Sequence, residues 1–195
     1  MGVLFVIILY FCGAFPFSYL VPKIWKGVDV RKVGSGNVGS TNVIRAVGKP
    51  IGGFCMILDA LKVFLPLLVM KWVMTGQPHF SLWLSLAALS GVMGHDFSIF
   101  LRGRGGKGVA STMGAFFGIH LLSGSLFLAL ATTIALSTRL MSLGSLVGLV
   151  ASTLIIFPLT HDWYYLALYL FLTLFSFYQH RKNLIRLWQG KENPF

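Results

Sequence analysis

The sequence predicts an all-α integral membrane protein that forms a single membrane domain over residues 1–195. Its mean hydropathy of +0.80 and its 11% of charged residues lie outside the composition of soluble domains. Apolar runs recur along the whole chain, and several approach the ~20 residues that a helix needs to cross a bilayer. These runs are continuous rather than alternating, which favours helices over a closed β-barrel.

Six apolar segments predict the membrane-embedded elements. The first has no Lys or Arg before it and is followed by Lys23 and Lys26. That order favours a retained span that starts outside the cell over a cleavable signal peptide. A polar tail follows the last segment. The segments are 2–22, 50–73, 81–101, 109–136, 143–159 and 163–178.

The segment 109–136 decides the topology. If this segment crosses the membrane once, nine basic residues lie inside and six outside. If it folds into a hairpin around His120 to Ser125, fourteen basic residues lie inside and one outside. Lys62 is not counted, because it lies within a span. The positive-inside rule favours the hairpin. Each arm of about 12 residues would rise only ~18 Å. The sequence therefore predicts seven helical segments, with the N-terminus outside and the C-terminus in the cytoplasm.

The net charge of +11 suits basic loops that face anionic lipid headgroups, and we expect no nucleic-acid partner. Cys12 and Cys55 lie in different apolar segments and predict neither a disulfide nor a zinc site. No carboxylate cluster indicates a divalent cation. We expect no metal and no cofactor.

Two glycine-rich loops carry the strongest signals for anion binding. The first is GSGNVG, at 34–39, within the longer polar stretch 29–49. It lacks the strand and acidic residue of a dinucleotide-binding fold, but its glycines let backbone N–H groups approach a phosphate. The alternative is an ordinary polar loop with helix caps. The candidate substrate-binding residues here are Ser35, Gly36, Asn37, Asn42 and Arg45.

The second loop is GRGGKG at 103–108, which carries Lys107 into the predicted segment 109–136. Gly106 and Gly108, on either side of the lysine, are further candidate substrate-binding residues. It does not match a Walker A loop, because Gly108 follows the lysine and residue 101 is Leu. A basic stop-transfer cluster is the alternative interpretation.

Two further segments give weaker signals on the predicted cytoplasmic side. Arg139 and Ser142 lie one turn apart where a helix begins, and helix capping is the better explanation of that pattern alone. In the tail, His180 and Asn183 are spaced to share a helical face. An interfacial basic helix anchored by Trp188 is the alternative there.

Asp59 and Lys62, also three residues apart, lie inside the second apolar segment. Charges at that depth are costly, so we expect a structural ion pair, with contact to a substrate as the alternative.

These stretches together resemble the bacterial membrane-bound acyl-phosphate:glycerol-3-phosphate acyltransferase family. The pieces that carry the resemblance, in chain order, are SGNVGSTNVIRAVGK, LDALK, GHDF with GGKGVAS, RLMSLGSL and HRKNLIRLWQGKEN. This sequence departs from the family's pattern at Ser40, Ser98 and Val63, which are peripheral to the polar positions that carry the resemblance. The family positions carried over residue by residue are Ser35, Arg45, Lys107, Ser142, His180 and Asn183.

The resemblance implies an enzyme of the bacterial inner membrane that makes lysophosphatidic acid. It would transfer a fatty acyl group from acyl phosphate to the 1-hydroxyl of glycerol-3-phosphate, and the enzyme that supplies acyl phosphate is a candidate partner. We take Lys107 and His180 as the catalytic candidates. The active site is expected to form from segments 29–49, 102–112, 138–146 and 179–195. A transporter of a small phosphorylated anion is the competing function, because basic residues that face a membrane cavity suit that too.

Overall fold

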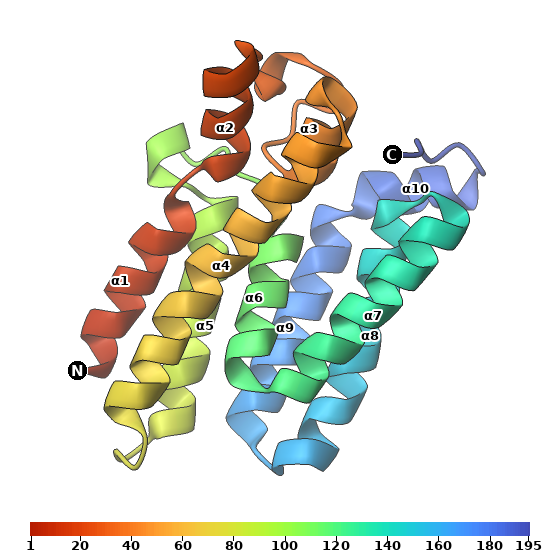
Figure 1. Cartoon of the computed structure of the whole chain (residues 1–195). Coiled ribbons are helices and arrows are strands. Elements are labelled where there is room, and N and C mark those ends of the chain that lie inside the picture. Colours follow the sequence, from red (N-terminus) through yellow and green to blue (C-terminus); the bar gives the residue numbers. More distant parts are fainter.

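The computed structural model describes all 195 residues and contains ten α-helices, two short 3₁₀ helices and no strand. The longer helices run roughly along one axis, and the short helices α2, α3 and α10 gather at one end (Figure 1). The elements are α1 (Gly2–Ala14), α2 (Phe17–Lys26), η1 (Val30–Lys32), α3 (Ser40–Val47), α4 (Lys49–Met74), α5 (Phe80–Asp96), η2 (Ile99–Leu101), α6 (Val109–Ile119), α7 (Leu121–Thr138), α8 (Met141–Thr160), α9 (Trp163–Gln179) and α10 (Arg181–Trp188).

The all-α membrane architecture is confirmed. Five helical stretches are long and apolar enough to cross a bilayer: Gly2–Lys26, Lys49–Met74, Phe80–Leu101, Leu121–Thr138 and Met141–Thr160. The shorter α6 and α9 lie among them (Figure 1). With α1 and α2 taken as one broken segment, these make the seven predicted segments.

The first predicted segment, 2–22, is present within the apolar stretch Gly2–Lys26, and a break at Pro16 that was not predicted divides it into α1 and α2. Proline has no N–H to donate and its ring clashes with the preceding turn, so α1 ends before Pro16 and α2 begins at Phe17. Side chains of Ser98, between α5 and η2 in sequence, and of Lys62, in α4, satisfy the carbonyls freed by the break. Ser98 Oγ donates to the Ala14 carbonyl at 2.5 Å, and Lys62 Nζ donates to the Phe15 carbonyl at 2.9 Å.

The predicted hairpin at 109–136 is present, with its turn at His120 between α6 and α7. Its arms are unequal: α6 has 11 residues, close to the expected 12, whereas α7 has 18 and is long enough to span. The second arm is longer than predicted because the turn is confined to His120 and α7 already begins at Leu121, and because helical structure continues to Thr138, before Arg139 in a left-handed conformation.

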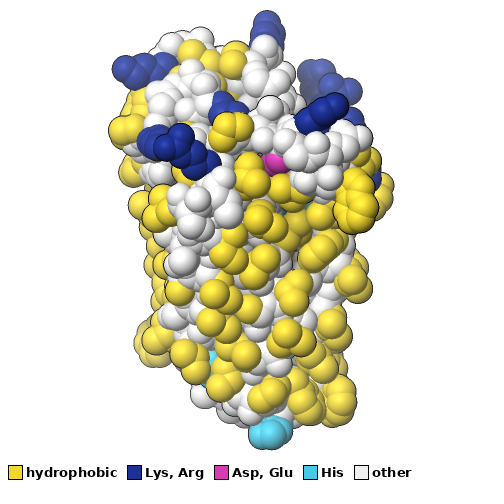
Figure 2. Space-filling view, turned by 90° about the vertical axis from the view of Figure 1, so that its right-hand side faces the viewer, with side chains coloured by type: hydrophobic (Ala, Val, Ile, Leu, Met, Phe, Trp, Pro, Cys, Tyr) yellow, Lys and Arg dark blue, Asp and Glu magenta, His cyan; other side chains and the backbone are white.

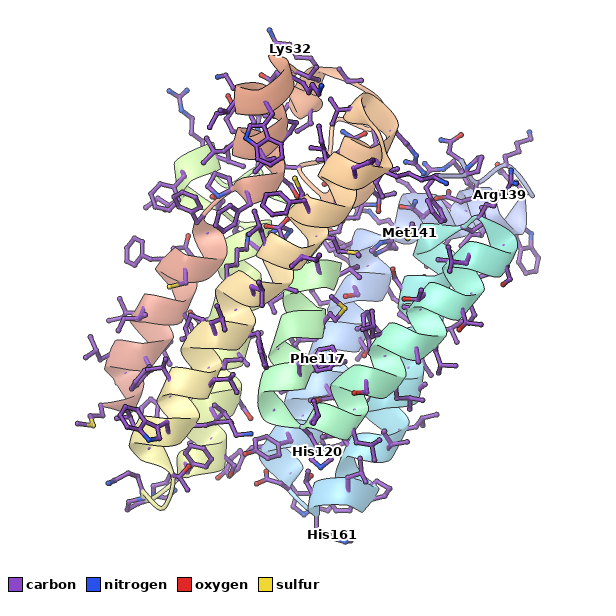
Figure 3. The ribbon with its side chains drawn as sticks, in the orientation of Figure 1. Lys32, Phe117, His120, Arg139, Met141 and His161 are labelled. Atoms are coloured by element: carbon purple, nitrogen blue, oxygen red, sulfur yellow. The ribbon has the colours of Figure 1, made fainter.

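The two ends of the molecule differ in charge. Lys and Arg side chains gather at one end of the surface in Figure 2, whereas the sides are apolar. Lys32 and Arg139 lie at this basic end, and His120 and His161 lie at the opposite end (Figure 3). The chain termini also lie at opposite ends (Figure 1). This polarity agrees with the predicted charge distribution; the placement of the basic end in the cytoplasm stays a prediction.

Glycines allow the helices to approach closely on one side of the bundle. A Cβ on Gly13 would lie 1.9 Å from the carbonyl oxygen of Gly91, and one on Gly94 would lie 2.2 Å from that of Tyr10. α1 therefore packs backbone to backbone against α5, as small residues permit in membranes. On the other side, the buried rings of Phe116 and Tyr169 stack at 3.7 Å between centroids and join α6 to α9.

Candidate active site

A cavity of about 320 Å³ lies toward the basic end of the bundle. All four segments expected to form the active site contribute to its lining, through residues such as Arg45, Lys107, Ser142 and His180. Its other wall is apolar and comes mainly from α7. That wall contains Phe127, Leu128, Ala131, Ala135 and Leu136, with Met56 and Met113 from α4 and α6. The cavity therefore joins a cationic polar region to an apolar face.

The first glycine loop is held in shape by Asn42, at the beginning of α3. The Asn42 amide donates to the carbonyls of Val30, Val33 and Asn37, and its oxygen accepts from the Ser35 N–H at 3.0 Å. Its side chain is buried. Asn42 borders the cavity, but its hydrogen bonds go to the loop backbone. In this structure it shapes the loop, and contact with a substrate stays a prediction.

The second glycine loop folds back onto the last turn of α5. The N–H groups of Gly105 and Gly106 donate to the carbonyls of Asp96 and His95, at 3.0 and 3.2 Å. A Cβ on Gly106 would lie 2.1 Å from His95 Nε2 and 2.7 Å from the carbonyl oxygen of Val38. The two glycine loops therefore meet at Gly106, where any side chain would collide with both neighbours.

Lys107 is joined to the tail by a chain of polar contacts. Its Nζ donates to Asn183 Oδ1, and Asn183 Nδ2 donates to Glu192 at 2.5 Å. Glu192 also accepts from Ser142 Oγ at 3.1 Å and from Arg186 Nε at 2.7 Å. A carboxylate of the tail thus lies among polar and cationic side chains that border the cavity.

The charges of these groups follow from their surroundings. Burial, together with the nearby charge of Arg186, lowers the pKa of Lys107 to about 8. Burial raises the pKa of Glu192, but hydrogen bonds from Arg186, Asn183 and Ser142 outweigh it and hold that pKa below its ordinary value. At neutral pH the pocket therefore holds a cationic lysine that deprotonates near pH 8, and an ionised carboxylate.

His180 lies where α9 ends and α10 begins, and it is buried. Its Nδ1 lies 2.8 Å from the Ser176 carbonyl, which can only accept, so the neutral ring carries its proton on Nδ1 and leaves Nε2 with a free lone pair. Burial and the charge of Lys107 lower the pKa of His180 to about 4. The imidazole is therefore neutral at physiological pH.

Arg45 is engaged by the tail as well. Its Nε donates to the Pro194 carbonyl at 3.2 Å, and its terminal nitrogen donates to the Asn193 carbonyl at 2.8 Å. Phe195 borders the cavity, and Lys49 lies over its ring at 5.7 Å. Asn193 and Pro194 thus hold Arg45, and Glu192 and Phe195 on either side of them border the cavity.

Of the residues predicted from sequence to bind substrate or catalyse, nine border the cavity and two do not. Gly36 turns the first loop with φ +69°, and Gly106 packs against His95. Both affect loop shape rather than the lining. The nine that border it are Ser35, Asn37, Asn42, Arg45, Lys107, Gly108, Ser142, His180 and Asn183.

Sequence reasoning missed Glu192 and Arg186, which also border the cavity. One signal was available for Glu192: the chain has only five acidic residues, and this one lies in an otherwise basic tail. Its partner Ser142 is 50 positions away in sequence, so no local pattern indicates the pair.

Fold and site together define a multi-pass membrane protein with an interior site suited to an anionic amphiphile. Comparison with known proteins narrows this class. The glycerol-3-phosphate acyltransferase family matches residues 3–190. A glycerol-3-phosphate acyltransferase of Pseudothermotoga lettingae is 45% identical over 181 residues, which cover 93% of this chain and 87% of that protein. One from Thermotoga petrophila is 46% identical over 189 residues, covering 97% and 94%.

Two crystal structures of PlsY (YgiH), an integral membrane glycerol 3-phosphate acyltransferase, have the same fold. The glycerol 3-phosphate form matches with a TM-score of 0.92 and 34% identity, covering all of this chain and 95% of that one. The lysophosphatidic acid form matches with a TM-score of 0.89 and 33% identity over the same shares. The chain belongs to the glycerol-3-phosphate acyltransferase family and is an acyltransferase. The transporter interpretation is therefore wrong.

Proposed function

We propose that this chain transfers a fatty acyl group from acyl phosphate to the 1-hydroxyl of glycerol-3-phosphate, giving lysophosphatidic acid and inorganic phosphate. The observation that carries the proposal is a single cavity with Arg45, Lys107 and Ser142 at one end and an apolar wall from α7 at the other. The acceptor and product are supported by the glycerol 3-phosphate and lysophosphatidic acid forms of the similar PlsY structures.

The two ends of the cavity suit the two parts of the donor. A fatty chain belongs against Phe127, Leu128 and Leu136, whereas both substrates bring phosphates that belong near Arg45 and Lys107. An Arg guanidinium can hold a phosphate with two parallel hydrogen bonds, and a lysine supplies a mobile point charge. Two anionic substrates explain why two glycine loops meet at one site.

In the proposed reaction, the 1-hydroxyl oxygen attacks the acyl carbonyl carbon and forms the new ester bond. The bond from that carbon to the phosphate oxygen breaks, and the phosphate leaves with the electron pair. Because the donor is already an activated mixed anhydride, positioning and charge stabilisation can supply most of the rate enhancement without a covalent enzyme intermediate. Lys107 and Arg45 would stabilise the negative charge that develops on the carbonyl and leaving oxygens.

The hydroxyl proton has two possible acceptors, and we favour a phosphate oxygen of the donor. A general base works best when its pKa lies near the working pH. His180 has a free Nε2 lone pair, but its pKa of about 4 makes it a weak base. The phosphate oxygens of the donor are attached next to the acyl carbonyl that the hydroxyl attacks, so they are positioned to accept the proton. We assign His180 to hydrogen bonding and orientation of a substrate.

His180→Gln tests this assignment, because glutamine retains hydrogen-bonding capacity without basicity. We expect kcat to stay within about tenfold of the unsubstituted enzyme. A fall of 1,000-fold or more, within the range for loss of a general base, would make His180 the base.

The tail has to give way if the engaged edge of Arg45 is to bind a substrate. The Nε of Arg45 and one of its terminal nitrogens donate to the carbonyls of Pro194 and Asn193, so this edge can hold a phosphate with two hydrogen bonds only after it releases them. The hydrogen bonds lost join the cationic guanidinium to neutral carbonyls, whereas those gained join it to an ionised phosphate, so that both partners are charged. Substrate binding and tail release are therefore coupled in this proposal.

We place the enzyme in the bacterial inner membrane, with the basic end and its cavity facing the cytoplasm. The positive-inside bias supports this orientation, and the similar acyltransferases come from bacteria such as Thermotoga petrophila. The acyl phosphate would come from a separate enzyme that makes this mixed anhydride.

Purified protein in detergent tests the function directly. Given acyl phosphate and glycerol-3-phosphate, it should release inorganic phosphate and form lysophosphatidic acid in equal amounts. Glycerol in place of glycerol-3-phosphate is the matched control and should not be acylated. Absence of both products, with the protein folded and monodisperse, would refute the proposed donor and acceptor pair.

A further inference from the structure

Asp59, Lys62 and His95 meet inside the bundle, beside the glycine loops, and all three are less than one-tenth exposed. Lys62 Nζ lies 2.7 Å from Asp59 Oδ1 and 2.9 Å from His95 Nδ1. The ion pair expected from the sequence is thus confirmed, and His95 is an addition to it. Charged groups at membrane depth are costly and usually serve a function. None of the three has a role in the chemistry proposed above.

Lys62 determines how the His95 ring is placed. A lysine ammonium only donates hydrogen bonds, so Nδ1 of His95 must accept, and the neutral ring carries its proton on Nε2. The Nε2 edge then faces Gly106, where an added Cβ would lie 2.1 Å away. The His95 carbonyl also accepts the Gly106 N–H at 3.2 Å. His95 therefore contacts Gly106 through both its ring and its backbone, and Lys107 is the next residue.

Asp59 connects the same cluster to the surrounding helices. Its Oδ2 accepts from Ser18 Oγ of α2 at 2.5 Å, and its carbonyl accepts from Ser111 Oγ of α6 at 3.0 Å. Lys62 also donates to the Phe15 carbonyl at the break between α1 and α2. Four separate helices are thereby held around the point where the second glycine loop enters α6.

We infer that Asp59, Lys62 and His95 form a positioning site for Lys107: Lys62 orients the His95 ring, and the ring sets the place of Gly106 and hence of the lysine after it. This inference rests on the proposed function. Lys107 Nζ reaches Asn183 Oδ1 across the cavity, so a displacement at Gly106 moves the ammonium away from its partner and from a bound phosphate. Misplacement by about 1 Å can reduce a rate by about 100-fold.

The test compares variants that disturb the cluster in different ways. The double substitution Asp59→Asn/Lys62→Met removes both charges together, which avoids stranding one buried charge. Lys71→Met is the matched control, because Lys71 lies on the same helix and its Nζ also donates to a backbone carbonyl, that of Ile119. We expect kcat/KM to fall about 100-fold in the double variant and to stay near the unsubstituted value in the control.

A double-mutant cycle with Lys107→Ala separates positioning from simple structural support. If the cluster acts through Lys107, adding Asp59→Asn/Lys62→Met to Lys107→Ala costs little more activity than Lys107→Ala alone. Fully additive losses would overturn the inference. So would a loss of kcat that matches the unfolded fraction while KM stays unchanged, because that is what a purely structural ion pair predicts.

Two substitutions of His95 provide a second test if the double variant does not fold. His95→Gln places an amide near the position of Nε2 and should retain more activity than His95→Asn, which reaches only the position of Nδ1. Equal loss in the two variants would contradict a role for the edge that faces Gly106.

Calorimetric binding of glycerol-3-phosphate gives a readout that does not depend on the donor. Weaker binding in the cluster variants, with Lys71→Met unchanged, supports the inference; equal binding in all of them opposes it. If the unsubstituted protein binds glycerol-3-phosphate but does not use acyl phosphate, the proposed function fails, and the positioning role is then decided by these dissociation constants.

Discussion

Substitution of Gly106 by alanine is the sharpest test of the loop geometry. The backbone of Gly106 is not in the left-handed region, so alanine is not excluded by its conformation. The obstacle is space, because the new methyl group would lie 2.1 Å from His95 Nε2 and 2.7 Å from the Val38 carbonyl oxygen. Neither neighbour is free to move, since Lys62 holds the His95 ring and the Val38 oxygen belongs to the other glycine loop.

The expected magnitude follows from these distances. Real Cβ contacts are essentially never shorter than 3.0 Å, so the contact to His95 must lengthen by about 0.9 Å from 2.1 Å. The second glycine loop would take up most of that displacement and carry Lys107 with it. A misplacement of about 1 Å is associated with a loss of about 100-fold, or about 2.7 kcal/mol of transition-state stabilisation. Overpacking also destabilises the fold by about 1–3 kcal/mol.

The assay is steady-state release of inorganic phosphate from acyl phosphate, with thermal unfolding in the same detergent as the fold control. Gly103→Ala is the matched comparison, because it lies in the same loop but has nothing within 4 Å of its Cβ position. Its φ of +76° makes alanine strained there, at about 1–2 kcal/mol, so stability should fall while kcat/KM stays close to the unsubstituted enzyme. If Gly106→Ala were as active as Gly103→Ala, the contact between the loops would not position Lys107.

Three further predictions concern charge and packing. The pKa of Lys107, about 8, predicts that kcat/KM falls as pH rises through that value, because the lysine loses the charge that binds phosphate. A flat kcat/KM profile from pH 7 to 10 would contradict this role of Lys107. The pKa of His180, about 4, predicts that this residue causes no fall in kcat/KM at any pH above 6. Arg45→Ala should raise KM for one of the two substrates by about 10- to 100-fold, as expected for loss of a hydrogen bond to a charged group. Initial rates with each substrate varied in turn would identify which phosphate Arg45 holds. An unchanged KM for both substrates would exclude Arg45 from the site. Gly13→Val should lower the thermal unfolding midpoint in detergent by several degrees. A Cβ at position 13 would lie 1.9 Å from the Gly91 carbonyl oxygen, and larger side chains prevent close helix packing in membranes. An unaltered midpoint would show that α1 does not pack backbone to backbone on α5.

The positions of the helices could be predicted from the sequence because the bilayer constrains every span in the same way. The boundaries of α4, α8 and α9 fall within two residues of the predicted segments. The hairpin of α6 and α7 also followed from the distribution of Lys and Arg. The break at Pro16 was missed because hydropathy averages over it: the freed carbonyls are satisfied by Lys62 and Ser98, which only the folded chain brings there.

The candidate site was only partly predictable. Lys107 and Arg45 stand out because Lys107 lies within a glycine-rich loop and Arg45 follows one closely, a pattern typical of anion binding. Glu192 does not stand out, since its importance depends on Ser142 and Asn183 being folded around it. Asn42 was identified as polar and well placed, but no pattern in the sequence distinguishes an amide that binds a ligand from one that holds its own loop.

Repeated membrane crossing, the gathering of the basic loops at one end and, through the family resemblance, the expected reaction could all be inferred before folding was considered. These properties depend on composition, on charge and on short motifs. The folded chain was needed to show that Lys62 contacts His95, that His95 abuts Gly106 and that the tail holds Arg45. The physical reason is that such contacts join residues tens of positions apart, and their geometry depends on helix packing rather than on any one segment.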